Sequence, residues 1–69
     1  MRNDLFLIEM GKRIRTIRKA KKISLRKLEQ LTDIDDVNLM RIEHGRKSSY
    51  ILTLKSIADA LGVDVKDFF

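Results

Sequence analysis

The sequence of 69 residues contains no cysteine, no proline and only three glycines. Without cysteine the chain can form no disulfide framework, no thiolate zinc site and no cysteine nucleophile. No run of apolar residues approaches the roughly 18 that a membrane helix needs, and the first residues lack the pattern of a signal peptide. We therefore expect a cytoplasmic protein whose fold depends on packing alone.

Basic residues are concentrated in the first half of the chain. Residues 1–31 carry ten Lys and Arg against three acidic residues, a net charge of +7, whereas residues 32–69 carry a net charge of −2. Such asymmetry is typical either of a surface that faces nucleic-acid phosphates or of a solvated helix face. Charge alone does not distinguish the two.

Apolar residues recur at the spacing of an α-helix over most of the chain. The pattern predicts a helix over residues 5–21, with Asn3 or Asp4 as its N-cap, and a helix of about two turns after Ser24. Gly11 lies inside the first of these helices, where glycine costs about 1 kcal/mol relative to alanine. We therefore expect another segment of backbone to approach closely at Gly11.

The next segment has the spacing of a helix-turn-helix motif. Asp35 is a favourable N-cap for a helix that runs to about residues 43–44, and Gly45 follows it. Only residues 32–34 separate this third helix from the second, a connector short enough to force a tight corner. The motif therefore occupies about residues 24–45. The apolar face of the third helix consists of Ile34, Leu39 and Ile42.

Two further helical elements complete the sequence. Residues 50–61 have the apolar spacing of a helix, which Gly62 ends with a left-handed turn. Asp64 then caps a terminal turn that reaches Phe69. The sequence thus predicts an all-α, compact, five-helix fold that forms a single domain over residues 1–69.

Residues 11–69 contain three stretches with a familiar pattern, namely GKRIRTIRKAKKISLRKLEQL, RIEHGRK and TLKSIADALGVDVKDFF. These stretches resemble the lambda-repressor and Cro-like (XRE-type) family of helix-turn-helix transcriptional regulators. The resemblance implies a homodimer that binds double-stranded DNA sequence-specifically by inserting the third helix into the major groove, more often as a repressor than as an activator. No cofactor and no small-molecule effector are expected.

The resemblance implies a base-reading surface on the third helix. In the family, early residues of this helix contact base edges. By type, Arg41 suits guanine, Asn38 suits adenine or a phosphate, Val37 suits the methyl group of thymine, and an aspartate suits the N4 amine of cytosine. An ordinary solvent-facing helix is the alternative. The implied base-contacting residues are Asp35, Asp36, Val37, Asn38 and Arg41, with Met40 beside them.

The resemblance also implies contacts to DNA phosphates. In the family, an arginine near the end of the first helix pairs with a glutamate near the end of the third and is thereby oriented beside a phosphate. These positions are Arg18 and Glu43 here. Further residues around the motif correspond to phosphate contacts, although by type they can serve solubility alone. They are Arg26, Lys27, His44, Arg46, Lys47, Ser48 and Ser49.

Three positions depart from the pattern of the family. Leu25 replaces the polar residue that opens the second helix, Glu29 replaces a small residue, and Asp33 replaces the glycine of the turn. We expect Glu29 to extend into solvent and Asp33 to adopt a left-handed conformation, which aspartate tolerates better than most residues. Asp33, Asp35 and Asp36 would repel phosphates unless a base amine or a basic neighbour compensates.

An enzyme is not expected. His44 is the only histidine, and the sequence shows no pairing of nucleophile and base, no metal-ligand set and no glycine-rich phosphate loop. The alternative function is a protein-binding module of the same fold, such as an antitoxin or an adaptor, because the third helix is acidic and several apolar residues exceed the needs of the core.

The surplus apolar residues equally suit a homodimer interface. By the resemblance, the paired surface lies on the fourth and fifth helices. A second interpretation is open for the two terminal phenylalanines, which can instead complete the core. The predicted interface residues are Tyr50, Leu52, Phe68 and Phe69.

Overall fold

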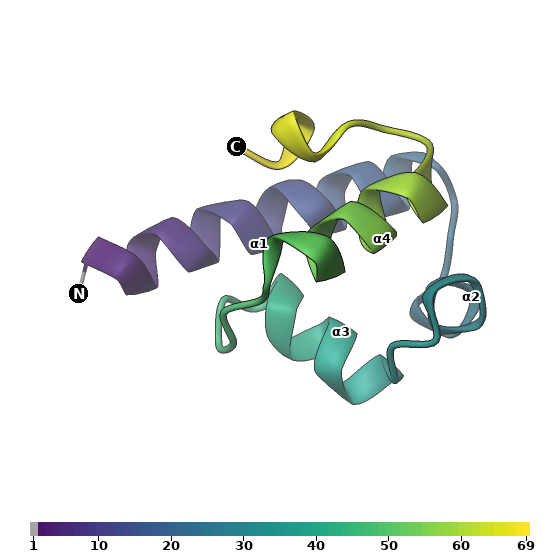
Figure 1. Ribbon diagram of the computed structural model, residues 1–69, viewed down its shortest axis with the longest axis horizontal. Helices are drawn as coiled ribbons and strands as arrows, with labels where there is room; N and C mark the ends of the chain where they lie inside the picture. The colour runs from purple at the N-terminus through teal and green to yellow at the C-terminus, as the bar shows by residue number, and fades with distance from the viewer. Residues whose placement is uncertain (1) are drawn as a thin grey trace.

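The computed structural model describes residues 2–69, with side chains from Asp4 onward. This part of the chain contains four α-helices, one short 3₁₀ helix and no strand (Figure 1). The all-α class is confirmed, but the predicted fifth helix is a 3₁₀ turn, the form that short helical pieces commonly take. The elements are α1 (Arg2–Ala20), α2 (Leu25–Thr32), α3 (Asp36–Glu43), α4 (Ile51–Leu61) and η1 (Val65–Phe68).

Helix α1 begins at Arg2, earlier than predicted. No proline or glycine interrupts the chain before Gly11, and Asp4 lies in the first turn, where its charge favours the positive end of the helix dipole. Both predicted N-caps are therefore wrong, because Asn3 and Asp4 lie inside α1. Beyond Ala20 the chain turns through Lys22, which has a φ of 58°.

The core lies between α1 and the elements that follow it. Figure 1 shows α1 along the length of the molecule, with η1 on one side of it and α3 on the other. The apolar side chains of every helix meet there, and none of the helices over residues 2–69 is long and apolar enough to cross a membrane. The buried apolar residues are Met10, Ile14, Leu28, Leu39, Ile42, Leu54, Ile57, Ala58, Leu61 and Phe68.

The starts of α2 and α3 and the end of α4 are capped as the sequence predicts. Ser24 Oγ accepts a hydrogen bond from the backbone N–H of Lys27 (3.0 Å) at the start of α2. Asp35 Oδ1 accepts one from the backbone N–H of Asn38 (2.7 Å) at the start of α3. Gly62 ends α4 with a φ of 74°. Because these caps give partners to otherwise free backbone groups, they fix where the helices of the motif begin and where α4 ends.

Asp33 occupies the left-handed conformation expected of it. Its φ is 61° and its ψ is 17°, and its backbone N–H donates to the carbonyl oxygen of Glu29 (2.8 Å) at the end of α2. Glu29 itself is half-buried, so its side chain reaches solvent only in part. An L-residue in this conformation brings its Cβ close to the following carbonyl oxygen, which costs about 1 kcal/mol or more.

Replacing Asp33 by glycine should therefore stabilise the protein. Glycine removes the Cβ contact but loses more backbone entropy on folding, so we expect Asp33→Gly to raise the free energy of unfolding by about 0.5–1 kcal/mol. Urea unfolding followed by circular dichroism measures the change. As a control, Gln30→Gly in the middle of α2 should lower stability by about 1 kcal/mol. A decrease in the free energy of unfolding of Asp33→Gly would show that the aspartate side chain stabilises the turn.

Candidate nucleic-acid interface

Helices α2 and α3 form the corner that the sequence predicts. Residues 33–35 join the two helices, and Leu28 of α2 and Leu39 of α3 are both fully buried. Thr32 closes the corner, because its Oγ1 donates to the carbonyl oxygen of Leu28 (2.7 Å) and accepts from the backbone N–H of Ile34 (3.2 Å). The turn is thus held by side chains as well as by the backbone, which gives α3 a fixed orientation relative to α2.

The outer face of α3 is exposed to solvent. The helix buries Leu39, Ile42 and Glu43 and exposes the side chains between them. In Figure 1, α3 lies at the margin of the molecule, with no element outside it. The exposed residues of this outer face are Asp36, Val37, Met40 and Arg41.

Two of the predicted base-contacting residues are bonded to each other. Asp35 caps α3, and its Oδ2 also accepts from Nδ2 of Asn38 (3.3 Å). Oδ1 of Asn38 in turn accepts from Nζ of Lys47 (3.0 Å), a residue predicted to contact phosphate. The ammonium group of Lys47 therefore lies beside Asn38 in the first turn of α3 and adds a positive charge near the acidic start of the helix.

The other three predicted base-contacting residues have no such partner. Among the residues that the structure describes, the side chains of Asp36 and Arg41 make no hydrogen bond or ion pair, and Val37 is 47% exposed. Their functional groups are a carboxylate, a guanidinium and a branched apolar group. These three side chains are available to a ligand without breaking any hydrogen bond or ion pair within the described residues.

Arg18 and Glu43 form a buried ion pair between α1 and α3. Nε of Arg18 lies 2.6 Å from Oε2 of Glu43, and Nη2 lies 3.0 Å from Oε1, so the pair is bidentate. Nη1 donates to the carbonyl oxygen of Ile23 (2.9 Å). The two residues are 7% and 6% exposed, respectively.

The phosphate contact of Arg18 stays a prediction, and the burial of the residue limits it. Every nitrogen of the guanidinium already has a protein partner, and little of its surface remains for a phosphate. The partnership with Glu43 is the one that the resemblance implies. Its visible effect is to hold the end of α3 against α1, because a bidentate pair fixes both distance and orientation.

Gly11 lies beside this pair, where α1 crosses α3. A Cβ atom built on Gly11 would lie 2.5 Å from the carbonyl oxygen of Ile42 and would overlap that of Glu43. The expected close approach of another backbone segment is therefore confirmed. Together, Gly11 and the pair of Arg18 and Glu43 determine how deeply α3 sits against α1.

The remaining predicted phosphate-contacting residues lie before and after α3 in the sequence. Arg26 and Lys27 are exposed in the first turn of α2, and the others lie in the segment that follows α3. The imidazole of His44 is near the carbonyl oxygen of Met40, with Nδ1 at 2.8 Å, so it packs back onto the last turn of α3. The exposed residues of this segment are His44, Arg46, Lys47 and Ser48, whereas Ser49 is half-buried.

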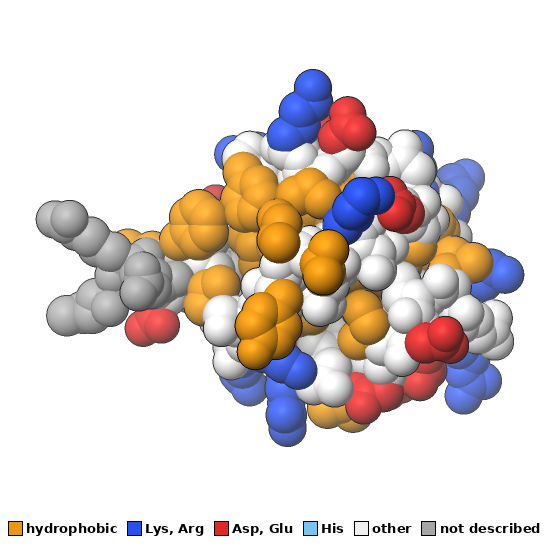
Figure 2. All heavy atoms as spheres, in the orientation of Figure 1, with side chains coloured by type: hydrophobic (Ala, Val, Ile, Leu, Met, Phe, Trp, Pro, Cys, Tyr) orange, Lys and Arg blue, Asp and Glu red, His pale blue; other side chains and the backbone are white. Residues whose placement is uncertain are grey.

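An exposed apolar face lies elsewhere on the molecule. The rings of Phe6 and Phe69 stack with centroids 5.6 Å apart, and both line a hollow of about 300 Å³ together with Ile51. Figure 2 shows hydrophobic side chains gathered over this region. Tyr50 and Leu52 are 85% and 74% exposed. The apolar face therefore consists of Phe6, Tyr50, Ile51, Leu52 and Phe69.

Phe68 is not part of the apolar face, contrary to one of the predictions for the dimer interface. Its side chain is fully buried in the core, because the η1 turn directs it inward while Phe69 remains exposed. Phe6 and Ile51 belong to the apolar face but are not among the predicted interface residues. The stack of Phe6 on Phe69 joins the two ends of the chain, and no local sequence pattern reveals such a contact.

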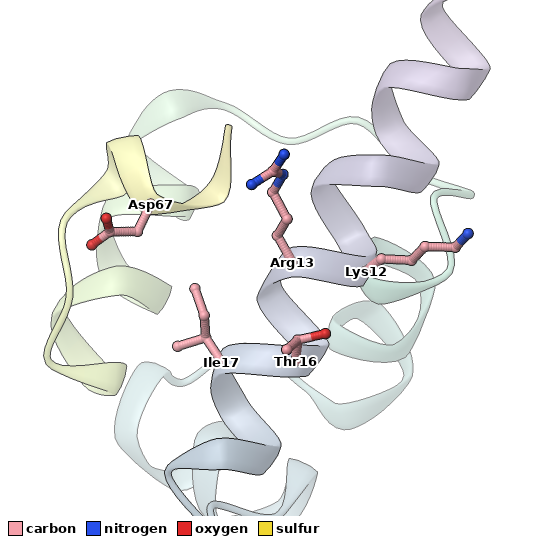
Figure 3. Close-up of a pocket in the computed structure, with 5 residues that line it drawn as sticks. All are labelled: Lys12, Arg13, Thr16, Ile17 and Asp67. Carbon is pink, nitrogen blue, oxygen red and sulfur yellow. The ribbon is translucent and has the colours of Figure 1, made fainter.

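A separate hollow of about 260 Å³ lies between α1 and η1 (Figure 3). Figure 3 shows the side chain of Arg13 extending towards the C-terminal segment, whereas that of Lys12 points away from Asp67. Figure 1 places η1 on the side of α1 opposite to α3, so this hollow is not part of the motif's surface. Among the described residues, no group of three or more His, Asp or Glu side chains is placed to hold a metal ion.

Comparisons with solved structures show a common fold. The restriction-modification controller protein C.AhdI from Aeromonas hydrophila superimposes with a TM-score of 0.88 at 27% identity, covering 91% of this chain and 96% of that one. The clp gene regulator ClgR from Corynebacterium glutamicum gives 0.88 at 30% identity, covering 91% and 81%. An HTH_3 family transcriptional regulator from Vibrio cholerae gives 0.90 at 31% identity, covering 97% and 38%.

Sequence comparison agrees with the structural one. A search of curated protein sequences gave no match. The family model described as "Helix-turn-helix domain", however, matches residues 11–69. These are the same residues that carry the resemblance found in the sequence. The chain therefore belongs to the helix-turn-helix domain family and, within it, to the XRE-type regulators.

Proposed function

We propose that this chain is a sequence-specific transcriptional regulator that inserts α3 into the major groove of double-stranded DNA. The exposed outer face of α3 carries this inference, because an α-helix fits the major groove and exposed basic residues precede and follow α3 in the sequence. The solved relatives include a controller protein and a gene regulator. Repression is the simpler outcome, since it requires only that the operator be occupied.

In this role the chain works as a binding protein and not as an enzyme. Residues 1–69 act as one domain, and neither a cofactor nor an effector is needed for DNA binding. Action on chromosomal DNA also agrees with the predicted cytoplasmic location.

Selection of binding sites from a random pool of double-stranded DNA tests the proposed function. We expect a (pseudo)palindromic sequence that the protein binds at least about 1,000-fold more tightly than random DNA. Weak binding that is insensitive to sequence and lost at moderate salt would contradict a sequence-specific regulator. That result would favour the protein-binding module, for which the acidic start of α3 and the apolar face are the supporting observations.

Lys47→Ala should weaken binding to all DNA sequences by a similar factor. We expect the slope of log affinity against log salt to fall by about one, because one phosphate contact and its released counterions are lost. Fluorescence anisotropy at several salt concentrations measures both quantities. Lys66→Ala is the matched control, since Lys66 is exposed in η1, away from α3. An unchanged salt slope for Lys47→Ala would remove Lys47 from the DNA contact.

We further propose that two copies of the chain pair through the apolar face. An isologous pairing would bury the same side chains on both copies, which accounts for apolar residues as exposed as Tyr50 and Leu52. Two α3 helices related by a two-fold axis would then read half-sites about 10 base pairs apart. The two-fold symmetry of the dimer is also the reason why we expect site selection to give a palindromic operator.

Leu52→Asp should convert the dimer to a monomer. A carboxylate at this position would be desolvated without a partner in the proposed dimer, whereas in the first turn of α4 it favours the helix dipole, so the fold is kept. Sedimentation velocity at tens of micromolar measures the change. As the control, Gln30→Asp adds the same charge at an exposed position of α2, and this variant should remain a dimer. A wild-type protein that sediments only as a monomer would exclude this arrangement.

A further inference from the structure

We infer, on the basis of the proposed function, that Val37 and Arg41 determine the operator sequence by reading a thymine and a nearby guanine in each half-site. The structure separates these two residues from the other predicted base-contacting positions. Asp35 and Asn38 are held by each other and by Lys47, so their polar groups already have partners. Val37 and Arg41 are exposed and make no polar contact within the described chain.

Val37 lies at the centre of the outer face of α3. At 100° per residue it points away from Leu39 and Ile42, the two buried apolar residues of the helix. An apolar side chain in this position gains by covering another apolar group. The only such group on the floor of the major groove is the C5-methyl group of thymine. Valine is also stiff at χ1 in a helix, so its methyl groups are already positioned before binding.

Arg41 follows Val37 by one helical turn on the same face. Its guanidinium has no partner in the described structure, and it matches the O6 and N7 acceptors of guanine with two parallel hydrogen bonds. The rise along α3 from Val37 to Arg41 is about 6 Å, and base pairs stack about 3.4 Å apart. The guanine therefore lies within about two base pairs of the thymine.

Asp36 determines on which side of the thymine the guanine lies. Its free carboxylate can only accept hydrogen bonds, so it repels the O6 and N7 atoms of guanine and tolerates the amines of cytosine or adenine. Asp36 lies at the start of α3 and Arg41 one turn further on. The guanine is thus confined to the side of the thymine that faces Arg41.

Replacing single thymines by 2′-deoxyuridine tests the role of Val37, because only the C5-methyl group is lost. In the operator obtained by selection, we expect one thymine per half-site at which the replacement weakens binding about fourfold, the value of one buried methyl group. In Val37→Ala the same replacement should have no further effect. Met40→Ala, at a second exposed apolar position of α3, should retain the fourfold loss.

Exchange of the neighbouring G·C pair for A·T tests Arg41. The wild-type protein should lose about 5- to 150-fold in affinity, whereas Arg41→Ala should bind both sequences within about twofold of each other. Arg41→Lys keeps the positive charge but cannot donate two parallel hydrogen bonds to guanine. This variant should therefore bind DNA while losing most of the preference for G·C over A·T. Both variants change an exposed side chain, and their circular dichroism should match that of the wild type.

The outcomes separate this inference from the proposed function. If no operator is selected, the proposed function itself fails. If an operator is selected but no thymine methyl group affects binding, the assignment to Val37 is wrong. It is equally wrong if the methyl effect persists in Val37→Ala or disappears in Met40→Ala. A guanine preference that survives in Arg41→Ala would transfer the guanine contact to another residue.

Discussion

Glu43→Gln is expected to lower the free energy of unfolding by about 3 kcal/mol or more, a large fraction of the stability of so small a domain. The substitution leaves the guanidinium of Arg18 buried without its counter-charge. Both members of the pair are almost fully buried, and the carboxylate accepts two of the guanidinium's hydrogen bonds. A buried charge that loses its partner keeps its desolvation cost without the compensating attraction.

A double-mutant cycle separates the pair from its individual residues. Arg18→Met and Glu43→Leu each remove one charge, and the double variant that combines them should lose much less stability than Glu43→Leu alone, since a buried pair replaced by apolar groups of similar size is often neutral. Some loss remains, because the methionine side chain cannot donate to the carbonyl oxygen of Ile23 as Arg18 does. Urea unfolding at one fixed protein concentration gives the four free energies.

The exposed ion pair of Lys55 and Asp59 is the matched control. Nζ of Lys55 lies 3.0 Å from Oδ2 of Asp59, but the two side chains are 62% and 64% exposed. Asp59→Asn should therefore change stability by about 0.5 kcal/mol or less, since such pairs are screened by solvent. If Glu43→Gln and Asp59→Asn lowered the free energy of unfolding by similar amounts, burial would not determine how much the pair of Arg18 and Glu43 contributes to stability.

The sequence predicts the helices well because their signals are local. Helical spacing and caps such as Ser24 and Asp35 involve residues within a turn of each other, and the structure has these caps. A glycine inside a helix was enough to predict the close approach at Gly11, because glycine is otherwise unfavourable there. The left-handed conformation of Asp33 was expected from the resemblance, because the family has a glycine at this position of the turn.

The details of the candidate site depend on contacts that are distant in sequence. The bond from Lys47 to Asn38 spans nine residues and a change of direction, so no periodicity reveals that Asn38 is already engaged. Helical spacing also could not decide which of two adjacent phenylalanines, Phe68 or Phe69, points inward. That choice depends on how η1 packs against α1, and the stack of Phe6 on Phe69 depends on it as well.

Gly11→Ala should destabilise the protein by about 3 kcal/mol, although the same substitution in an exposed helix interior stabilises by about 1 kcal/mol. The added Cβ would lie 2.5 Å from the carbonyl oxygen of Ile42 and would overlap that of Glu43, whereas ordinary contacts begin near 3.4 Å. Both atoms belong to the backbone of α3. No side chain can therefore rotate away, and α3 must move off α1.

Gly62→Ala separates this steric effect from backbone conformation. Gly62 has a φ of 74°, but a Cβ there would meet no atom closer than 4.0 Å, so only the left-handed conformation is penalised, by about 1 kcal/mol. Both variants are best made in the Asp33→Gly background. The added stability of that background should keep Gly11→Ala folded in the absence of urea. If Gly11→Ala is more stable than its parent, α1 and α3 do not touch as described. Because the displaced element is α3, Gly11→Ala should also lose operator affinity, whereas Gly62→Ala should keep it.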